Sequence, residues 1–250
     1  MTRKLGWFDI LRLGLVQAAI GSLVVITTST LNRVLVVELA LPAILPGVLV
    51  ALHYFVQVVR PRFGYDSDLG GRRTPWIIGG IATLAAGGVG AVLATCLMPI
   101  NLALGIALAV LAFIVIGLGV GASGTALLVL MSKRIAPQRL AAAATVTWLM
   151  MIVGFIVTSV IAGRMLEPFS LTRLVETTVG IGLVALLVTV LAVYGIERDI
   201  AEVPAAPAQA ERKDFVAVLR EVWAEPHSRR LTSFIFVSML AYSAQDLILE

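Results

Sequence analysis

The sequence predicts an all-α protein that crosses a membrane several times. Hydrophobic residues make up 59% of the chain and charged residues only 14%, whereas soluble domains carry about 25% charged residues. The apolar residues are gathered into runs long enough to cross a hydrocarbon core of about 30 Å. Because lipid admits only helices or closed barrels, and these runs are too long for barrel strands, each run is expected to be a helix.

Windows of about 19 residues predict six complete spans and the start of a seventh. The predicted spans are 13–31, 43–59, 75–98, 102–130, 140–163 and 174–194, followed by a helix from Leu231 onward. The fourth span exceeds one crossing, so we expect it to tilt or to project from the membrane. The spans divide the chain into a six-helix bundle over 1–194, a cytoplasmic linker over 195–230 and a seventh helix over 231–250 that starts a second bundle.

The basic residues predict the orientation of the bundle. All of the 19 lysines and arginines except Arg33, Arg164 and Arg173 lie before the first span or in the loops after spans two, four and six. By the positive-inside rule, these segments and the N-terminus are cytoplasmic. The net charge of +4 is therefore a topology signal, and no nucleic-acid partner is predicted.

The linker contains a predicted amphipathic helix. Phe215, Val218, Leu219 and Val222 recur at helical spacing, with Trp223 beside them. This pattern is typical of a helix that lies on a membrane surface. The helix is either a docking surface for a partner or a cover for the inner face of the bundle.

Three polar residues occur unexpectedly far along the seventh helix: Gln245, Asp246 and Glu250. If the helix enters the bilayer at Leu231, Asp246 lies about 22 Å deep at 1.5 Å per residue. An ionisable group at that depth costs at least about 2.5 kcal/mol and usually faces a partner or a pathway. The two carboxylates are four residues apart and share one helix face. They form an intramembrane polar site, unless the helix ends here and they lie at the interface.

Polar residues also mark the first two spans. Asn32, Arg33 and Glu38 follow the first span on the external side, as an external polar cluster or as an interfacial cap with a snorkelling arginine. His53 is the only histidine inside a span. Imidazole is a common metal ligand, also for the magnesium of a chlorophyll, so His53 is a candidate pigment ligand; alternatively it hydrogen-bonds a neighbouring helix.

The loop after the second span resembles the signature of the major facilitator superfamily. Its matching residues are Gly64, Asp68, Gly71, Arg72 and Arg73, whereas Leu69 stands where a basic residue is usual. The glycines are expected to permit a tight turn. Asp68 and the arginines are expected to pair with a neighbouring helix end and to latch one conformation. The alternative is a turn with ordinary inside-positive charge.

The remaining patterns in the sequence do not indicate catalytic or cofactor chemistry. Gly119, Gly121 and Gly124 match a dinucleotide fingerprint by letter, but they lie in an apolar run without a preceding strand. With Gly117 they predict a face for close helix packing. The chain shows no nucleophile–base set and no spaced metal ligands, so we predict neither an enzyme nor a metal site.

Four stretches together resemble the bacteriochlorophyll delivery family, the PucC-like branch of the major facilitator superfamily. They are Thr30–Val34 continuing to Val37–Leu39 and Pro42, then Gly71–Trp76, Phe169–Leu174 and Gln245–Glu250. The last matches a Gln-Asp, two apolar residues, Leu-Glu motif of the seventh helix. The resemblance is nearest to members associated with bacteriochlorophyll synthesis. Family members usually have about twelve spans, so the chain is expected to be truncated or half of a larger protein.

The resemblance implies a multi-pass protein of the inner, intracytoplasmic membrane of phototrophic bacteria. It implies bacteriochlorophyll or a precursor as cargo, and light-harvesting or reaction-centre subunits or pigment-synthesis enzymes as partners. His53 and the small-residue faces of spans three and four would then border a pigment groove. The alternatives are a proton-coupled transporter of a small solute, with Asp246 and Glu250 as proton sites, and a subunit that docks a pigment-synthesis enzyme through the linker helix.

Overall fold

A computed structural model describes residues 5–69, 72–197 and 215–249 of the chain. The chain separates into two compact units, 1–203 and 204–250, which are described one at a time. The described residues are helical with short connections and contain no strand. This confirms the predicted all-α fold class.

The first unit contains the helices that are long and apolar enough to cross a membrane. Among the described residues there are six such candidates, Trp7–Glu38, Ile44–Ser67, Thr74–Leu97, Leu102–Arg134, Pro137–Met165 and Leu171–Val193. The secondary structure elements are α1 (Trp7–Val25), η1 (Ile26–Thr30), α2 (Leu31–Arg33), η2 (Val34–Glu38), α3 (Ile44–Val56), η3 (Gln57–Val59), α4 (Arg60–Leu69), α5 (Thr74–Leu97), α6 (Leu102–Arg134), α7 (Pro137–Met165) and α8 (Leu171–Val193). The chain is therefore a multi-pass membrane protein.

The first span continues beyond its predicted end through two π-helical turns. The span was expected to end at residue 31, but η1 and η2 carry the helix on to Glu38. The wider turn is visible in the hydrogen bond from the Leu39 N–H to the Val34 carbonyl, 3.0 Å long. Such turns are rare in proteins as a whole, and those that occur often lie at functional sites. The predicted external residues lie on or between these turns.

The glycine-containing segment after the second span differs from its prediction. Gly64 was expected in a tight turn, but α3 continues through η3 into α4, which ends at Leu69. An Arg62–Asp66 ion pair at 3.4 Å, one helical turn apart, supports this helix. The Phe63 ring also packs against α6, 3.1 Å from where a Cβ on Gly121 would lie. Packing against α6 thus keeps the chain helical past the first glycine.

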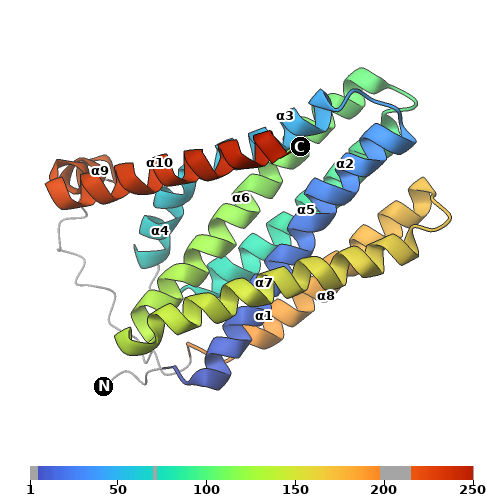
Figure 1. The fold of residues 1–250 in the computed structure, drawn as a ribbon. Coiled ribbons are helices and arrows are strands. Elements are labelled where there is room, and N and C mark those ends of the chain that lie inside the picture. The colour runs from blue at the N-terminus through green and yellow to red at the C-terminus, as the bar shows by residue number, and fades with distance from the viewer. Residues whose placement is uncertain (1–4, 70–71, 198–214, 250) are drawn as a thin grey trace. The chain divides into compact units, whose positions relative to one another are not determined.

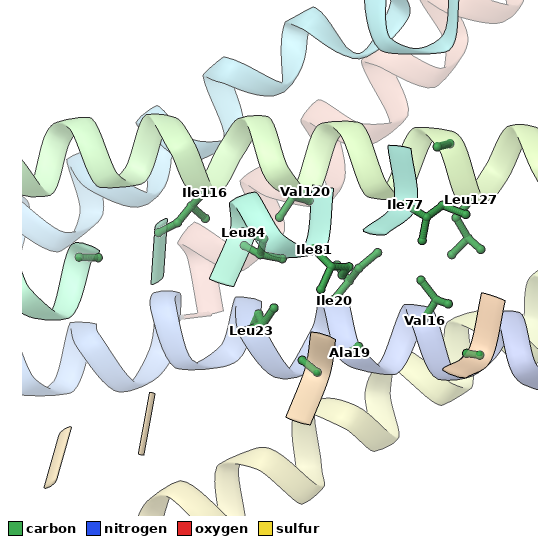
Figure 2. Close-up of a cluster of buried hydrophobic side chains, with 14 of the residues drawn as sticks. Val16, Ala19, Ile20, Leu23, Ile77, Ile81, Leu84, Ile116, Val120 and Leu127 are labelled. Carbon is green, nitrogen blue, oxygen red and sulfur yellow. The ribbon is translucent and has the colours of Figure 1, made fainter. Parts of the chain in front are cut away.

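The core of the first unit lies between α1, α5 and α6. Figure 2 shows Leu23 and Ile20 of α1 near Ile81 and Leu84 of α5, with Ile116 of α6 on the far side. Around this core α1 packs against α7 and α8, while α3 and α4 pack against α6 (Figure 1).

Glycines bring these helices into backbone contact. A Cβ on Gly119 would lie 2.5 Å from the backbone nitrogen of Leu84, so α5 and α6 touch at this point. A Cβ on Gly117 would lie 2.7 Å from the carbonyl oxygen of His53 in α3. The close-packing face predicted for the fourth span is confirmed.

The second unit contains α9 (Phe215–Ala224) and α10 (Pro226–Leu249). Leu219, Val222 and Trp223 of α9 are each about half exposed, so α9 presents an apolar face. The seventh helix was predicted from Leu231, and α10 begins earlier, at Pro226.

Candidate functional site

The predicted intramembrane polar site lies at the end of α10. Gln245 and Asp246 belong to this helix, but their side chains are not among those that the structure describes, and Glu250 lies outside the described residues. The polar site therefore stays a prediction.

His53 lies in α3 on the face that packs against α6, and only 1% of its surface is exposed. Its Nε2 is 3.1 Å from the amide nitrogen of Gln57, one turn further along. The amide can donate to this nitrogen when the ring proton is on Nδ1. Nδ1 itself has no partner among the described residues. The partner Gln57 lies on the same span as His53, whereas the alternative interpretation expected a neighbouring helix, and axial ligation of a pigment by His53 stays a prediction.

A groove lies between α4, α5 and α6, beside the small-residue faces of the third and fourth spans. Its volume is about 400 Å³, and His53 does not line it. The rings of Phe63 and Trp76 stand 6.2 Å apart at its edge. The lining residues are Phe63, Pro75, Trp76, Gly79, Gly80, Thr83, Leu118 and Ala122. We call this the aromatic groove.

The start of α5 holds a buried carboxylate that the sequence did not reveal. Glu197, which follows α8, is 6% exposed. Its Oε2 accepts hydrogen bonds from the backbone N–H of Arg73 at 2.9 Å and of Thr74 at 2.7 Å, and its Oε1 lies 3.1 Å from the Arg73 nitrogen. A carboxylate is favoured here, because a helix N-terminus carries unpaired N–H groups and partial positive charge.

Two arginines hold the segment next to Glu197. Arg134, at the end of α6 and 7% exposed, donates to the Ile196 carbonyl at 3.5 Å. Arg12 of α1 donates to the carbonyls of Tyr194 and, at 3.5 Å, Leu191. Cations are favoured at the unpaired carbonyls that end a helix. Together, Arg12, Arg134 and Glu197 join α1, α5, α6 and α8 at one end of the bundle; we call this set the clasp.

The clasp contacts the backbone of one residue of the predicted latch, Arg73. In the prediction Asp68, Arg72 and Arg73 pair with a helix end; in the structure the backbone at Arg73 is itself part of a helix end, and the carboxylate comes from Glu197. Gly64 is helical, Arg72 is exposed, and Gly71 and the Asp68 side chain lie outside what is described. A latch that uses Asp68 stays a prediction. Glu197 was missed because nothing local to Ile196–Glu197 identifies a partner more than a hundred residues earlier in the chain.

Two of the predicted external residues line a small pocket of about 210 Å³ that has both polar and apolar residues in its wall and that we call the polar pocket. Arg33 and Glu38 line it, with the hydroxyls of Ser29 and Thr30 from η1 and of Ser159 from α7. Asn32 is exposed and is not among the lining residues. The pocket thus brings a cation, a carboxylate and hydroxyls together beside two π-helical turns. No group of three or more potential metal ligands occurs in the part of the chain that the structure describes.

Comparison with known proteins supplies the family. A family model described as PUCC protein matches residues 30–250. A Rhodobacter capsulatus protein, "Bacteriochlorophyll synthase 44.5 kDa chain", is 51% identical over 98% of this chain and 57% of its own length. Another from that organism, "Uncharacterized protein in puhA-bchM intergenic region", is 30% identical over 97% of this chain and 53% of its own.

"Protein PucC" of Rhodovulum sulfidophilum is 28% identical over 96% of this chain and 56% of its own length. The chain thus spans about half the length of the curated relatives it matches. No solved structure matches it. The family model covers most of the chain, and the resemblance noted in the sequence is confirmed: the chain belongs to the PUCC protein family.

Proposed function

We propose that this chain is part of a membrane protein that handles bacteriochlorophyll-type pigment during the biogenesis of photosynthetic complexes. The observation that carries the proposal is the relative that is 51% identical over 98% of the chain and is named for bacteriochlorophyll synthesis. Membership of the PUCC protein family supports the same role. In this proposal the chain binds or passes on pigment and does not transform it.

The aromatic groove is the best-suited place for the pigment ring. A tetrapyrrole is flat, apolar and aromatic, and stacks favourably on aromatic side chains such as Phe63 and Trp76. A Cβ on Gly79 would meet no neighbouring side chain or helix of the described part of the chain within 4 Å, so a flat ring can approach the backbone of α5 at this point. A volume of about 400 Å³ lies within the usual range of ligand sites, about 300–1,000 Å³. It would enclose part of a pigment whose remainder lies in lipid.

The distribution of basic residues supports a proposal about the location and orientation of the protein. We propose that the protein lies in the inner membrane with its N-terminus in the cytoplasm, because basic residues lie at the ends where α1 begins and α6 ends. The clasp is then on the cytoplasmic side. It would hold the bundle together at that side while pigment exchanges through the lipid-facing groove.

The test is an absorption spectrum, with solvent extraction, of the protein. It would be purified in mild detergent from a bacterium that makes bacteriochlorophyll. We expect pigment in stoichiometric amount, strongly reduced by Gly79→Leu, which fills the groove, and unchanged by Gly47→Leu. Gly47 is the matched control because a Cβ there also meets nothing within 4 Å and it lines none of the cavities described here.

The outcome also decides the role of His53. Loss of pigment in His53→Leu with retention in Gly79→Leu would move the site from the groove to the histidine. A colourless parent protein would overturn the proposal.

A second function is favoured by the exposed apolar face of α9. Leu219, Val222 and Trp223 are each about half exposed, and such a face can dock a pigment-synthesis enzyme. Replacing Leu219 and Val222 by serine should then abolish co-purification of the enzyme without changing bound pigment. Co-purification that survives these changes would exclude this role.

A further inference from the structure

A second groove, lined by three helices, lies apart from the aromatic groove; we call it the apolar groove. Its walls are residues 153–165 of α7 and 177–188 of α8, and residues 15–22 of α1 form its floor. Its volume is about 480 Å³. Both walls pack on α1 (Figure 1), and at Gly154 the approach is so close that a Cβ would lie 2.4 Å from the Ala18 carbonyl oxygen.

The lining of this groove suits a hydrocarbon chain. Of the described residues that form it, none is charged, and the polar ones are the hydroxyl residues Ser22, Thr158 and Thr177. Its rim is open to the surroundings, since Val157 and Val184 are at least half exposed. Along α8 it extends for about 16 Å at 1.5 Å per residue, enough for an extended chain of about a dozen carbon atoms.

Thr177, Thr178 and Thr189 of α8 each have a buried hydroxyl without a partner among the described residues, and of these three only Thr177 lines the groove. Thr27, Thr95 and Thr147 each donate to the carbonyl four residues earlier, at 2.8–3.0 Å. Thr177 is 1% exposed, and its Oγ1 has no hydrogen-bond partner among the described residues. A buried hydroxyl without a partner is costly. In a groove of this kind its natural partner is an acceptor on the ligand, such as an ester carbonyl.

Charged groups suitable for a lipid headgroup lie in the polar pocket, which adjoins the groove along α7. Thr158 and Met165 line the apolar groove, and the residues that follow them, Ser159 and Leu166, line the polar pocket that contains Arg33 and Glu38. An arginine is well suited to phosphate, and a carboxylate to an ammonium group. The two cavities share α7 as a wall, and together they offer an apolar groove, a hydroxyl donor on α8 and a pair of opposite charges on α2 and η2.

We propose that the groove between α1, α7 and α8 binds one ester-linked acyl chain of a zwitterionic phospholipid, with its ester near Thr177 and its headgroup toward Arg33 and Glu38. In a bilayer the chain gains little from leaving the surrounding lipid, because both environments are apolar. Binding therefore depends on the fit to the groove and on the Thr177 hydroxyl. The proposal goes beyond pigment handling and does not depend on it.

The test is photolabelling by a phospholipid whose acyl chain carries a diazirine. The protein is reconstituted in phosphatidylethanolamine vesicles that contain a small fraction of diazirine-bearing phosphatidylethanolamine. After irradiation it is digested, and the labelled sites are mapped by mass spectrometry. We expect labels concentrated on residues 153–165 and 177–188. Equal labelling of all lipid-exposed helices would overturn the proposal.

Three variants separate a specific site from general lipid contact. Gly180→Leu projects into the groove where a Cβ meets nothing within 4 Å, and should lower groove labelling about tenfold, equivalent to 1.4 kcal/mol. Thr177→Val should lower it about threefold to tenfold, as expected for one hydrogen bond, and Gly47→Leu should leave it unchanged. Groove labelling that changes in neither Gly180→Leu nor Thr177→Val contradicts the proposal.

Competition identifies the occupant. Unlabelled phosphatidylethanolamine should displace the probe from the groove, whereas an isoprenoid ester, such as the esterified tail of a pigment, should not. Displacement by the isoprenoid ester at a lower concentration than by phosphatidylethanolamine would overturn the phospholipid assignment.

Discussion

The clasp predicts that removing the Glu197 carboxylate loosens the bundle at the end where α5 begins. Two backbone N–H groups, those of Arg73 and Thr74, donate to this carboxylate at distances of 2.7–3.1 Å. A hydrogen bond to a charged group contributes about 1.5–3 kcal/mol, and an anion at a helix N-terminus about 0.3–2 kcal/mol. Water can reach part of the freed backbone, so we expect Glu197→Ala to lower the free energy of unfolding by about 2–4 kcal/mol.

Glu197→Gln should have a smaller effect. The amide oxygen can still accept one hydrogen bond, but the charge is lost, so the expected cost is about 1–2 kcal/mol. The two variants therefore separate the contribution of the charge from that of the acceptor. Glu176→Gln is the matched control, because Glu176 is exposed on α8 and its replacement should leave the unfolding temperature unchanged.

The single cysteine of the chain, Cys96, makes this measurable. Cys96 is partly buried at the far end of α5, so a thiol-reactive fluorogenic dye reports its exposure as the purified chain is heated in detergent at a fixed scan rate. A change of 1 kcal/mol shifts the midpoint by about 2–4 °C in a chain of this size. A Glu197→Ala protein as heat-stable as the parent would refute the reasoning about the clasp.

The clasp also predicts coupling between its members. Arg134 donates to the Ile196 carbonyl, next to Glu197 in the chain. If both side chains hold the same segment, the combined effect of Arg134→Met and Glu197→Gln should be smaller than the sum of the single effects. Groups that share a network usually show an interaction energy of about 0.5–3 kcal/mol, and strict additivity would mean that they act separately.

Two further predictions follow from the core. Gly119→Ala should destabilise the bundle by about 1–3 kcal/mol, because the added Cβ would lie 2.5 Å from the Leu84 nitrogen. Gly79→Ala is the control, because a Cβ there meets nothing within 4 Å. Equal unfolding midpoints of the two variants in the dye assay would contradict the packing argument. Gln57→Leu should cost about 1–3 kcal/mol by leaving the buried His53 ring unpartnered, and adding His53→Leu should recover most of this loss. A double variant no more stable than Gln57→Leu would show that the His53–Gln57 contact does not stabilise the fold.

The span pattern could be predicted from the sequence because hydrophobicity alone determines it. Each predicted run overlaps a helix, and the ends differ by only a few residues except where polar residues extend a helix. The first span continues to Glu38 although Asn32 and Arg33 interrupt its apolar pattern. The helix at Gly64 was missed for a related reason: packing of Phe63 on Gly121 outweighs the local preference of glycine for a turn.

The candidate sites were less predictable, because they depend on contacts between distant parts of the chain. His53 was identified by its residue type, but its neighbour Gln57 and its close approach to α6 were not. Glu197 looked like an ordinary residue at the start of the linker, and only the fold brings it to the start of α5. Arg134 was interpreted as a topology signal, whereas in the structure it is buried and donates a hydrogen bond to the Ile196 carbonyl.

The helix glycines distinguish positions that serve helix packing from positions that line cavities, and they do so more clearly than the polar residues. Four described glycines have nothing within 4 Å of a built Cβ: Gly47, Gly79, Gly163 and Gly180. Helix packing requires none of them, yet a glycine costs a helix interior about 1 kcal/mol relative to alanine. Three of the four line cavities: Gly79 the aromatic groove, Gly163 the polar pocket and Gly180 the apolar groove.

The absent side chain at these three positions thus leaves space at the surface of the bundle that no other part of the described chain fills. Leucine has a higher helix propensity than glycine, so placing leucine at each position should preserve or raise the unfolding temperature while closing the corresponding cavity. Ligand retention and fold stability would then change in opposite directions. That result is the one expected of a binding site, whereas loss of both together would indicate that the glycine serves the fold.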